Sequence, residues 1–266
     1  MSTIFTKLIP WAGAKWWMLN LLMRYLPMEY GDVYIPFGGR LDVLQILRAN
    51  GYEKHVYASD ISSRLILCHN AVKFWPEEVI ALLEEHRRNI SDDYYLSIRD
   101  RFHPEMPLAQ AGADHILVCQ NAYHGIIRMS AGGRCTNVNA RDGFRFKPET
   151  VRKHSFILRN TTIVAEDYAA TAMRAKPGDL VIFDPPYPDQ GSVYGCLGFS
   201  AEDHYRLRNA CDELNLKQVL FLMTNGNTNY IRHIYRKYVF TELEAPRTLG
   251  RAKNGGKSTE LLVTNY

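Results

Sequence analysis

The stretch VYIPFGGRLDVLQILRANG, residues 33–51, predicts a short strand, a glycine-rich turn and a helix that ends at Gly51. The run KHVYASDIS, residues 54–62, predicts a second strand with Asp60 at its carboxyl end. Strand, turn, helix and strand in this order open a parallel α/β sheet. Glycines in such a turn let the backbone approach a ligand, and an acid after the second strand commonly binds the hydroxyls of a ribose. A plain tight turn and a helix N-cap are the structural alternatives.

Further strands are predicted on both sides of a different central region. The continuous apolar runs TTIVAEDY (161–168), DLVIFDPPY (179–187) and QVLFLMTNG (218–226) are typical of strands buried on both faces. The segments YVFTELEAP (238–246) and TELLVTNY (259–266) predict antiparallel strands that finish the sheet. We expect helices at 17–27 and within 65–110, and irregular structure over 112–147. The chain therefore reads as one catalytic α/β domain, residues 1–64 and 158–266, with an insertion at 65–157.

Bulk composition narrows the class of protein only in part. The chain has 266 residues, of which 46% are hydrophobic and 23% charged, with a net charge of +4. This is globular composition, and the mild positive charge permits a polyanionic partner without requiring one. The 5 scattered cysteines favour a reduced, cytoplasmic protein, with no secretion signal, membrane segment or metal site expected. A monomer is the expected form.

The tetrapeptide Asp184-Pro185-Pro186-Tyr187 follows the apolar run LVIF. Ligands of open α/β sheets bind at such strand ends. A carboxylate and a backbone carbonyl can accept the hydrogens of a base amine and free its lone pair, and consecutive prolines fix the carbonyl because their φ is locked. Tyrosine offers a ring on which a base can stack. A capped strand end with a proline turn is the structural alternative, and enzymes that methylate guanine amines in RNA also carry this tetrapeptide.

Taken together, these segments resemble the Dam-type (D12 class, alpha group) DNA adenine N6-methyltransferases. PWAGAK (10–15), YIPFGG (34–39), SDI (59–61), EDY (166–168) and DPPY (184–187) resemble that family's cofactor and catalytic motifs in their order. LMTNG (222–226) and STELLVTNY (258–266) resemble the segments that follow. NAYHGIIRMS (121–130) resembles the opening of its DNA-reading hairpin. The resemblance covers nearly the whole chain.

The resemblance implies a Rossmann-like, S-adenosylmethionine-dependent sheet with a helical and β-hairpin DNA-recognition insertion. It implies duplex DNA as partner and a flipped adenine as the methyl acceptor. The implied catalytic residues are Asp184, Pro185, Pro186 and Tyr187. Those implied for the cofactor are Trp11, Ala12, Lys15, Phe37, Gly38, Gly39, Asp60, Asp167 and Asp184. Those expected at DNA, where Arg and Asn can bind phosphates and base edges, are Asn121, Tyr123, His124, Arg128, Arg134, Asn137, Asn139 and Arg141.

Several positions depart from the family pattern. Ile35 replaces a glutamate, Arg40 replaces a glycine, and Pro10 replaces a lysine. Arg40 either crowds the methionine end of the cofactor or turns its long side chain away. The DNA-reading region also differs, so the family's GATC target is not carried over. The alternatives left open are an RNA amino-methyltransferase, a cytosine N4-methyltransferase, and a catalytically impaired paralogue that binds DNA or cofactor.

Overall fold

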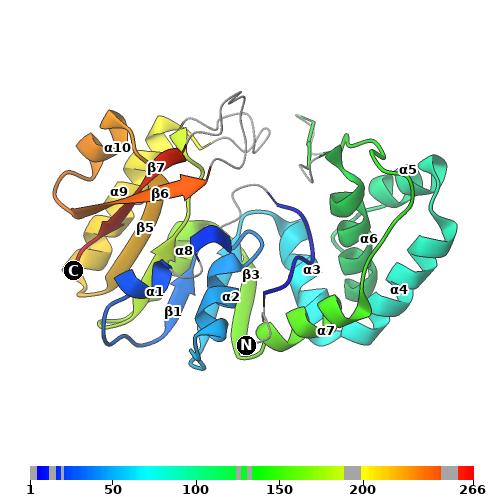
Figure 1. Ribbon diagram of the computed structural model, residues 1–266, viewed down its shortest axis with the longest axis horizontal. Coiled ribbons are helices and arrows are strands. Elements are labelled where there is room, and N and C mark those ends of the chain that lie inside the picture. Colours follow the sequence, from blue (N-terminus) through cyan, green and yellow to red (C-terminus); the bar gives the residue numbers. More distant parts are fainter. Residues whose placement is uncertain are drawn as a thin grey trace.

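The fold is built on a mixed β-sheet, seen in a computed structural model that describes residues 5–11, 16–18, 21–123, 127–130, 134–188, 199–246 and 257–266. The described residues form seven strands in the order β3-β2-β1-β4-β5-β7-β6 (Figure 1). Five strands are parallel: β1 (Val33–Ile35), β2 (Val56–Asp60), β3 (Thr161–Ala165), β4 (Leu180–Phe183) and β5 (Leu220–Gly226). Two are antiparallel: β6 (Val239–Pro246) and β7 (Lys257–Thr264). All seven expected strands are confirmed.

Helices cover both faces of this sheet. Successive strand residues point to opposite faces, so Leu180 and Ile182 of β4 join one hydrophobic cluster, while Val181 and Phe183 join the other. Among the helices on the first face are α1 (Leu22–Tyr25) and α2 (Asp42–Ala49). The second face packs on α8 (Tyr168–Ala172), α9 (Ala201–Leu216) and α10 (Asn229–Ile234). Burial on both faces explains why these strands read as continuous apolar runs.

A block of helices separates β2 from β3 in the sequence, although these strands are neighbours in the sheet. Its members are α3 (Ser63–Phe74), α4 (Pro76–Asn89), α5 (Asp92–Asp100), α6 (Leu108–Asn121) and α7 (Pro148–Ile157). In Figure 1 the block forms the half of the molecule opposite β6 and β7. We call it the insertion. Across the described part of the chain, no helix has the length and apolarity needed to cross a bilayer.

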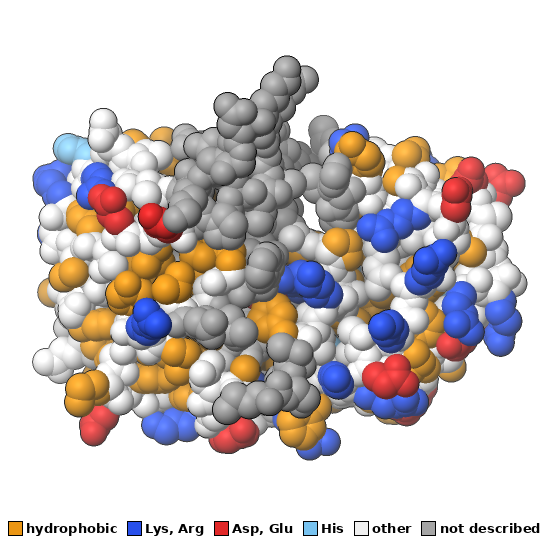
Figure 2. Space-filling view, viewed as in Figure 1, with side chains coloured by type: hydrophobic (Ala, Val, Ile, Leu, Met, Phe, Trp, Pro, Cys, Tyr) orange, Lys and Arg blue, Asp and Glu red, His pale blue; other side chains and the backbone are white. Residues whose placement is uncertain are grey.

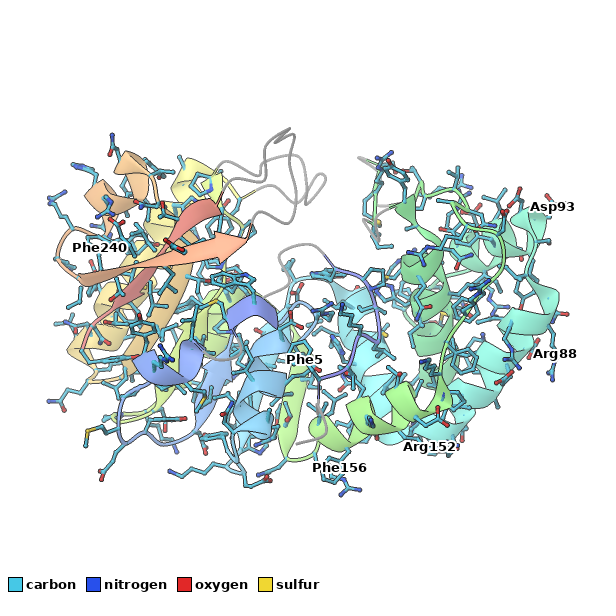
Figure 3. The ribbon with its side chains drawn as sticks, viewed as in Figure 1. Phe5, Arg88, Asp93, Arg152, Phe156 and Phe240 are labelled. Carbon is cyan, nitrogen blue, oxygen red and sulfur yellow. The ribbon has the colours of Figure 1, made fainter. Side chains whose placement is uncertain are left out.

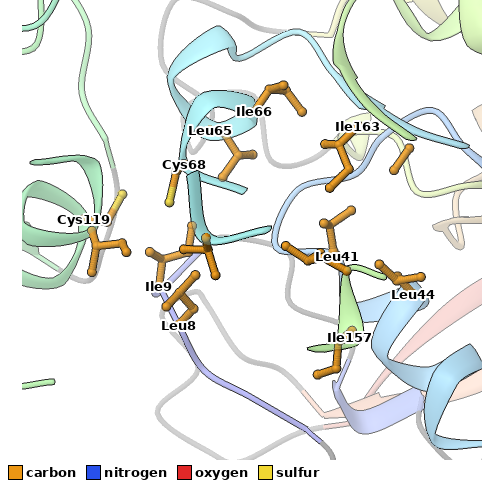
Figure 4. Packing of buried hydrophobic residues seen from close by; sticks show 14 of the residues in the cluster. Leu8, Ile9, Leu41, Leu44, Leu65, Ile66, Cys68, Cys119, Ile157 and Ile163 are labelled. Atoms are coloured by element: carbon orange, nitrogen blue, oxygen red, sulfur yellow. The ribbon is translucent and has the colours of Figure 1, made fainter. Parts of the chain in front are cut away.

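One hydrophobic core joins the insertion to the sheet. Leu44 of α2, Cys68 of α3, Cys119 of α6 and Ile157 of α7 belong to a single buried cluster (Figure 4). The amino-terminal Ile9 packs into the same cluster. Removing apolar surface from water stabilises both halves through this shared core, so the insertion is held rigidly relative to the sheet.

The expectation of irregular structure from residue 112 is wrong at its start, because α6 continues to Asn121. Gly112 explains the difference: a Cβ there would lie 2.3 Å from the Cβ of Ala71 in α3. The glycine therefore permits close helix packing, which outweighs its low helix propensity. Beyond Asn121, the described residues show an antiparallel bridge between Met129 and Cys135, which is the pairing of a short hairpin.

The prediction of one helix over residues 17–27 is also wrong, because the helical segments found there are shorter. The described residues show a short 3₁₀ turn, Trp16–Met18, and the four-residue α1. Leu26 leaves the helical conformation with ψ 146°. It precedes Pro27, whose ring disfavours the helical region for the residue before it.

Candidate active site

The candidate active site lies at the carboxyl edge of the parallel strands. The strand order reverses between β1 and β4, and ligands of open α/β sheets bind in the crevice outside such a reversal. The segments that follow β1, β2, β3 and β4 contact one another at this edge. The described contacts are the hydrogen bond of Gly39 to Asp60 and the ring contacts of Phe37 with Tyr168 and Phe183.

The turn after β1 requires its two glycines. The Gly38 N–H donates to the carbonyl of Ser59 at 2.6 Å, and a Cβ on Gly38 would lie 3.0 Å from that same oxygen. Gly39 has φ +48°, in the left-handed region that favours glycine. This close approach ties the turn to the end of β2.

Asp60 is oriented by the backbone on both sides. One carboxylate oxygen accepts the Gly39 N–H and the other accepts the Ser62 N–H, each at 2.9 Å. Burial raises the pKa of Asp60, while these backbone hydrogen bonds oppose the rise. Each carboxylate oxygen has a second lone pair, so a fixed carboxylate of this kind can also accept hydroxyls from a ligand.

Arg40 is turned away from the glycine turn. Its guanidinium donates two hydrogen bonds of 2.8 Å to the carboxylate of Asp42, and both residues are buried. Its Cζ lies 6.0 Å from the ring centroid of Phe5, which Figure 3 places beside α2. Of the two possibilities left by the sequence, the structure shows the second. Ile35, in place of the family's glutamate, is buried in the hydrophobic core.

Aromatic rings line the same edge of the sheet. Phe37 stacks on Tyr168 with centroids 4.9 Å apart and planes at 23°. The adjacent Asp167 caps α8 by accepting the Ala169 N–H at 2.9 Å, and it pairs with Arg206. The structure thus brings Phe37 and Asp167 to the end of the sheet where the sequence places the cofactor.

Asp184 directly follows β4 and is held by the next strand. The Thr224 hydroxyl of β5 donates to its carboxylate at 2.7 Å. The register of β4 with β5 aligns Phe183 with Met223, so the following residues, Asp184 and Thr224, also come side by side. The carboxylate therefore has a fixed direction at the carboxyl edge of the sheet.

Tyr187 is buried and held at both ends. Its hydroxyl donates to Glu260 of β7 at 2.7 Å, and its ring lies beside Gly226. Burial, followed by the nearby carboxylates of Asp184 and Glu260, raises the pKa of Tyr187 well above its ordinary value. The phenol is therefore neutral and acts as a donor. Between the two ends of the tetrapeptide, Pro185 is buried and Pro186 is half-buried.

The amino-terminal motif reaches the glycine turn through Trp11. A Cβ on Gly39 would lie 3.3 Å from the indole nitrogen of Trp11, which is half-buried. The indole also lies 6.5 Å, centroid to centroid, from the ring of His115. Ala12 and Lys15, also expected at the cofactor, lie outside the described residues.

A chain of buried side chains supports the turn from behind. His69 of α3 contacts the Gly39 carbonyl through Nε2 at 2.9 Å and His154 of α7 through Nδ1 at 3.2 Å. His154 in turn contacts the hydroxyl of Thr6 at 2.8 Å. A carbonyl only accepts, so His69 carries its proton on Nε2 and His154 donates to His69. Burial lowers the pKa of His69 to about 4, which keeps the imidazole neutral.

The residues expected at DNA divide into two groups. Tyr123, Arg128, Arg134 and Arg141 are exposed. Asn121 and Asn137 are instead buried: Asn121 donates to Asn139 and to the Gly143 carbonyl, and Asn137 accepts the Arg128 N–H. In this conformation these two asparagines brace the hairpin from beneath. Asn139 also donates to Asp92, and His124 lies outside the described residues.

The exposed arginines belong to a wider basic surface. Lys and Arg side chains are distributed over the insertion half of the face shown in Figure 2. Arg134 pairs with Asp100 at 2.8 Å, and the neighbouring Arg99 donates to the Asn137 carbonyl. These contacts fasten the hairpin to α5. Arg128 and Arg141 are exposed cations of a kind that can neutralise phosphates.

Thr224 and Glu260 were not predicted as site residues from the sequence. Both lie within segments that resemble family motifs, LMTNG and STELLVTNY. The sequence therefore marked the two segments, but it did not indicate what either residue does. Glu260 is 73 residues from Tyr187 in the chain. Only strand pairing brings these two residues together.

Comparisons with known proteins agree with this geometry. The family model for D12 class N6 adenine-specific DNA methyltransferases matches residues 11–249. The type II methyltransferase M1.LlaDCHI of Lactococcus lactis subsp. cremoris is 29% identical, over 98% of this chain and 95% of that protein. A DNA adenine methylase of Serratia marcescens is 28% identical, over 97% of each. The type II methyltransferase M.MjaIII of Methanocaldococcus jannaschii is 25% identical, over 97% of this chain and 98% of that protein.

The fold and site define an S-adenosylmethionine-dependent methyltransferase: a sheet reversal, a glycine turn locked to an acid, and a carboxylate-proline-proline-tyrosine segment meet at one edge. The chain belongs to the D12 class N6 adenine-specific DNA methyltransferase family. It is a DNA adenine N6-methyltransferase. This family membership decides against the RNA and cytosine alternatives.

The residues present fit S-adenosylmethionine. The backbone-oriented Asp60 carboxylate suits the ribose hydroxyls, and the rings of Phe37 and Tyr168 at the same edge of the sheet suit a purine. When bound, the cofactor supplies an electrophilic methyl group on a positively charged sulfur. Arg40, a cation that would oppose this sulfur, is neutralised by Asp42 and directed elsewhere.

Proposed function

We propose that this enzyme extrudes one adenine from duplex DNA and holds its amino group between the Asp184 carboxylate and the Pro185 carbonyl. Tyr187 supplies the ring against which the base lies. Extrusion is needed because the amine of a paired adenine cannot be reached inside the helix. The proximity of Tyr187 to Asp184 at the end of β4 supports the proposal, because it brings the ring and the carboxylate together.

The chemistry proposed for Asp184 is orientation and electrostatic stabilisation. The adenine amine is a poor nucleophile because its lone pair is delocalised into the ring. Two acceptors that bond both amine hydrogens direct the lone pair out of the ring plane toward the methyl group. As the nitrogen gains positive charge, the nearby carboxylate stabilises it, and the amine loses its proton after methyl transfer. No general base is required beforehand.

The observation that carries the proposal is the fixed carboxylate of Asp184. Thr224 donates to it at 2.7 Å from the neighbouring strand, so its direction is set before substrate binds. Pre-oriented dipoles need no reorganisation during the reaction, which is where most of their contribution to the rate originates. Asp184 also lies on the strand next to β1, whose glycine turn we assign to the cofactor.

The test is the Asp184→Ala variant. We expect it to lower the single-turnover methylation rate by at least about 100-fold, because it removes the stabilising carboxylate. Binding to duplex DNA should stay within about twofold of the wild type, since DNA affinity comes largely from phosphate contacts elsewhere. Glu242→Ala on β6, which loses a surface carboxylate paired with Arg232, is the control. Near-normal methylation by Asp184→Ala would refute the proposed role.

The exposed arginines of the insertion are proposed to contact the DNA. Arg128 and Arg141 lie on or next to the hairpin that resembles the family's DNA-reading segment, and Asn121 and Asn137 support it. Arginine neutralises phosphates and can bind guanine edges in a bidentate manner. Sequencing of modified adenines in DNA from an expressing host would give the recognition sequence.

We also propose that the enzyme is a monomer acting in the cytoplasm of a bacterial or phage-infected cell. Two of the relatives above are named type II methyltransferases, which supports a role in a restriction-modification system. Light scattering of the purified protein would give its mass in solution for comparison with the 30.6 kDa chain.

A further inference from the structure

We propose that Glu260 is a positioning residue of the reaction, which acts by holding the Tyr187 hydroxyl and so fixing the ring against which the base lies. This inference rests on the proposed function of Tyr187. It assigns a role to a residue at the start of the last strand, far in sequence from the catalytic tetrapeptide.

The antiparallel direction of β7 explains how Glu260 reaches the site. The parallel strands end at the active-site edge, whereas an antiparallel strand beside them begins there. β7 pairs with β5 so that Glu260 lies opposite Gly226, the last residue of β5. The Asn227 side chain donates to the Thr259 hydroxyl at 3.1 Å, which fastens the start of β7 to the segment after β5. Glu260 is thus held at the level of the tetrapeptide.

The contact itself is a hydrogen bond between a neutral phenol and a glutamate carboxylate. The Tyr187 hydroxyl and Glu260 Oε2 are 2.7 Å apart, the length of a well-formed O–H···O bond. A hydrogen bond to an ionised acceptor is stronger than one between neutral groups. Asp184 and Thr224 adjoin the same ring, so Asp184, Thr224, Tyr187 and Glu260 form one cluster.

Tyr187 is buried, and the hydrogen bond to Glu260 adds a directional contact at the hydroxyl end of its ring. The two preceding prolines fix the backbone but not the torsion angles of the side chain itself. Gly226 offers no side chain to confine the ring; a Cβ there would approach it no closer than 3.8 Å. Glu260 fixes the far end of the ring. A ring fixed in advance loses little conformational freedom when a base enters.

Glu260 also brings a second negative charge near Asp184, and this offers a different role, namely electrostatic attraction of the positively charged methyl donor. The two roles make opposite predictions for Glu260→Gln. The amide still accepts the phenol hydrogen bond but carries no charge. A positioning role predicts that Glu260→Gln is much less harmful than Glu260→Ala, whereas a charge role predicts equal losses.

The experiment compares Glu260→Gln, Glu260→Ala, Tyr187→Phe and the Tyr187→Phe/Glu260→Ala double variant. Single-turnover methylation of duplex oligonucleotides carrying the recognition site measures the rate constant, with KM for S-adenosylmethionine measured separately. Fluorescence of 2-aminopurine at the target position reports how the extruded base is stacked. Tyr238→Phe is the matched control, because its hydroxyl also donates to a carboxylate, Asp212, away from the site.

We expect Glu260→Ala and Tyr187→Phe each to lower the rate constant about tenfold and Glu260→Gln about threefold, the loss appropriate to one hydrogen bond. The double variant should be no slower than either single variant, because both remove the same bond. KM for S-adenosylmethionine should be unchanged, the 2-aminopurine signal should shift in step with the rate, and Tyr238→Phe should match the wild type.

Wild-type rates for Glu260→Ala, additive losses in the double variant, or equal losses for Glu260→Gln and Glu260→Ala would each overturn the inference. If Glu260→Ala does not fold, Glu260→Gln measured with and without Tyr187→Phe decides the question by the same logic. Tyr187→Ala separates this inference from the proposed function. If that variant retains full activity, the stacking role itself fails; if it is inactive while Glu260→Ala is normal, only the role of Glu260 fails.

Discussion

At the residue scale, the positive charge of Arg40 is neutralised by Asp42, which lies two positions further along the chain. Arg40, which departs from the pattern that the family resemblance implies, directly follows the two glycines of the turn. Asp42, two residues later, accepts one hydrogen bond from Nε and one from Nη2 of the Arg40 guanidinium, and the two side chains form a buried, bidentate pair. A planar guanidinium matched to a carboxylate satisfies both groups where water is excluded. The substitution therefore leaves the glycine turn open to the cofactor.

This pairing makes Asp42 important for stability. We expect Asp42→Ala to lower the free energy of unfolding by about 3 kcal/mol, because it leaves the Arg40 guanidinium buried without its carboxylate. Urea unfolding followed by circular dichroism measures the change. The Arg40→Met/Asp42→Leu double variant is the control and should recover most of the loss. An unchanged urea midpoint for Asp42→Ala would show that the pair contributes nothing to stability.

At the element scale, the cofactor turn depends on helices of the insertion. The Gly39 carbonyl, His69 of α3, His154 of α7 and Thr6 form one hydrogen-bonded chain. The Gly39 carbonyl only accepts, so the neutral His69 donates to it and in turn accepts from His154. The Thr6 hydroxyl lies 2.8 Å from His154 Nδ1 and also contacts Gln45 Oε1 at 3.1 Å. The first and last helices of the insertion thus support the turn at the end of β1.

His69 is the link that contacts the turn directly. We expect His69→Ala to weaken S-adenosylmethionine binding by about tenfold and to lower the free energy of unfolding by about 2 kcal/mol, because it removes one hydrogen bond to the turn and leaves His154 without an acceptor. Calorimetric titration with the cofactor and urea unfolding measure the two effects. His233→Ala, an exposed histidine on α10, should change neither quantity. Normal cofactor affinity in His69→Ala would mean that the chain does not hold the turn.

At the scale of the whole molecule, buried neutral histidines make stability depend on pH. Burial lowers the pKa of His69 and His204 to about 4 and that of His115 to about 3, and it lowers the pKa of His154 well below the ordinary value. The unfolded chain takes up protons near pH 6.5, whereas the folded protein does not. Stability is therefore fully present above pH 6.5 and declines as the pH falls from 6.5 toward 4.

We expect the free energy of unfolding to decrease in that range with a slope of up to about 1.4 kcal/mol per pH unit for each such histidine. Urea unfolding at successive pH values between 7 and 4.5 measures the slope. His204 is the position to vary, because its ring nitrogens are buried and show no hydrogen-bond partner among the described residues. His204→Leu should reduce the slope of the unfolding free energy against pH by about the contribution of one histidine. A flat profile in the wild type would contradict the buried, neutral state of these side chains.

The sequence by itself determined the elements and motifs whose signals are local. The apolar runs gave the strands because a strand buried on both faces needs no polar alternation. The glycine pair and Asp60 predicted a ligand-binding turn, because glycine allows the backbone to approach a ligand closely. The segment from Asp184 to Tyr187 predicted the catalytic residues. The same local reasoning was wrong about the start of the region expected to be irregular, because α6 continues to Asn121 and packs closely on Ala71 through Gly112.

Only the tertiary structure decided which long-range partners these residues meet. The direction of Arg40, the burial of Asn121 and Asn137, and the contact of Glu260 with Tyr187 depend on chain segments brought together by packing and strand pairing. The physical reason is that a residue's own sequence neighbours set its backbone conformation, whereas its burial and hydrogen-bond partners are set by whichever distant surface the core places against it.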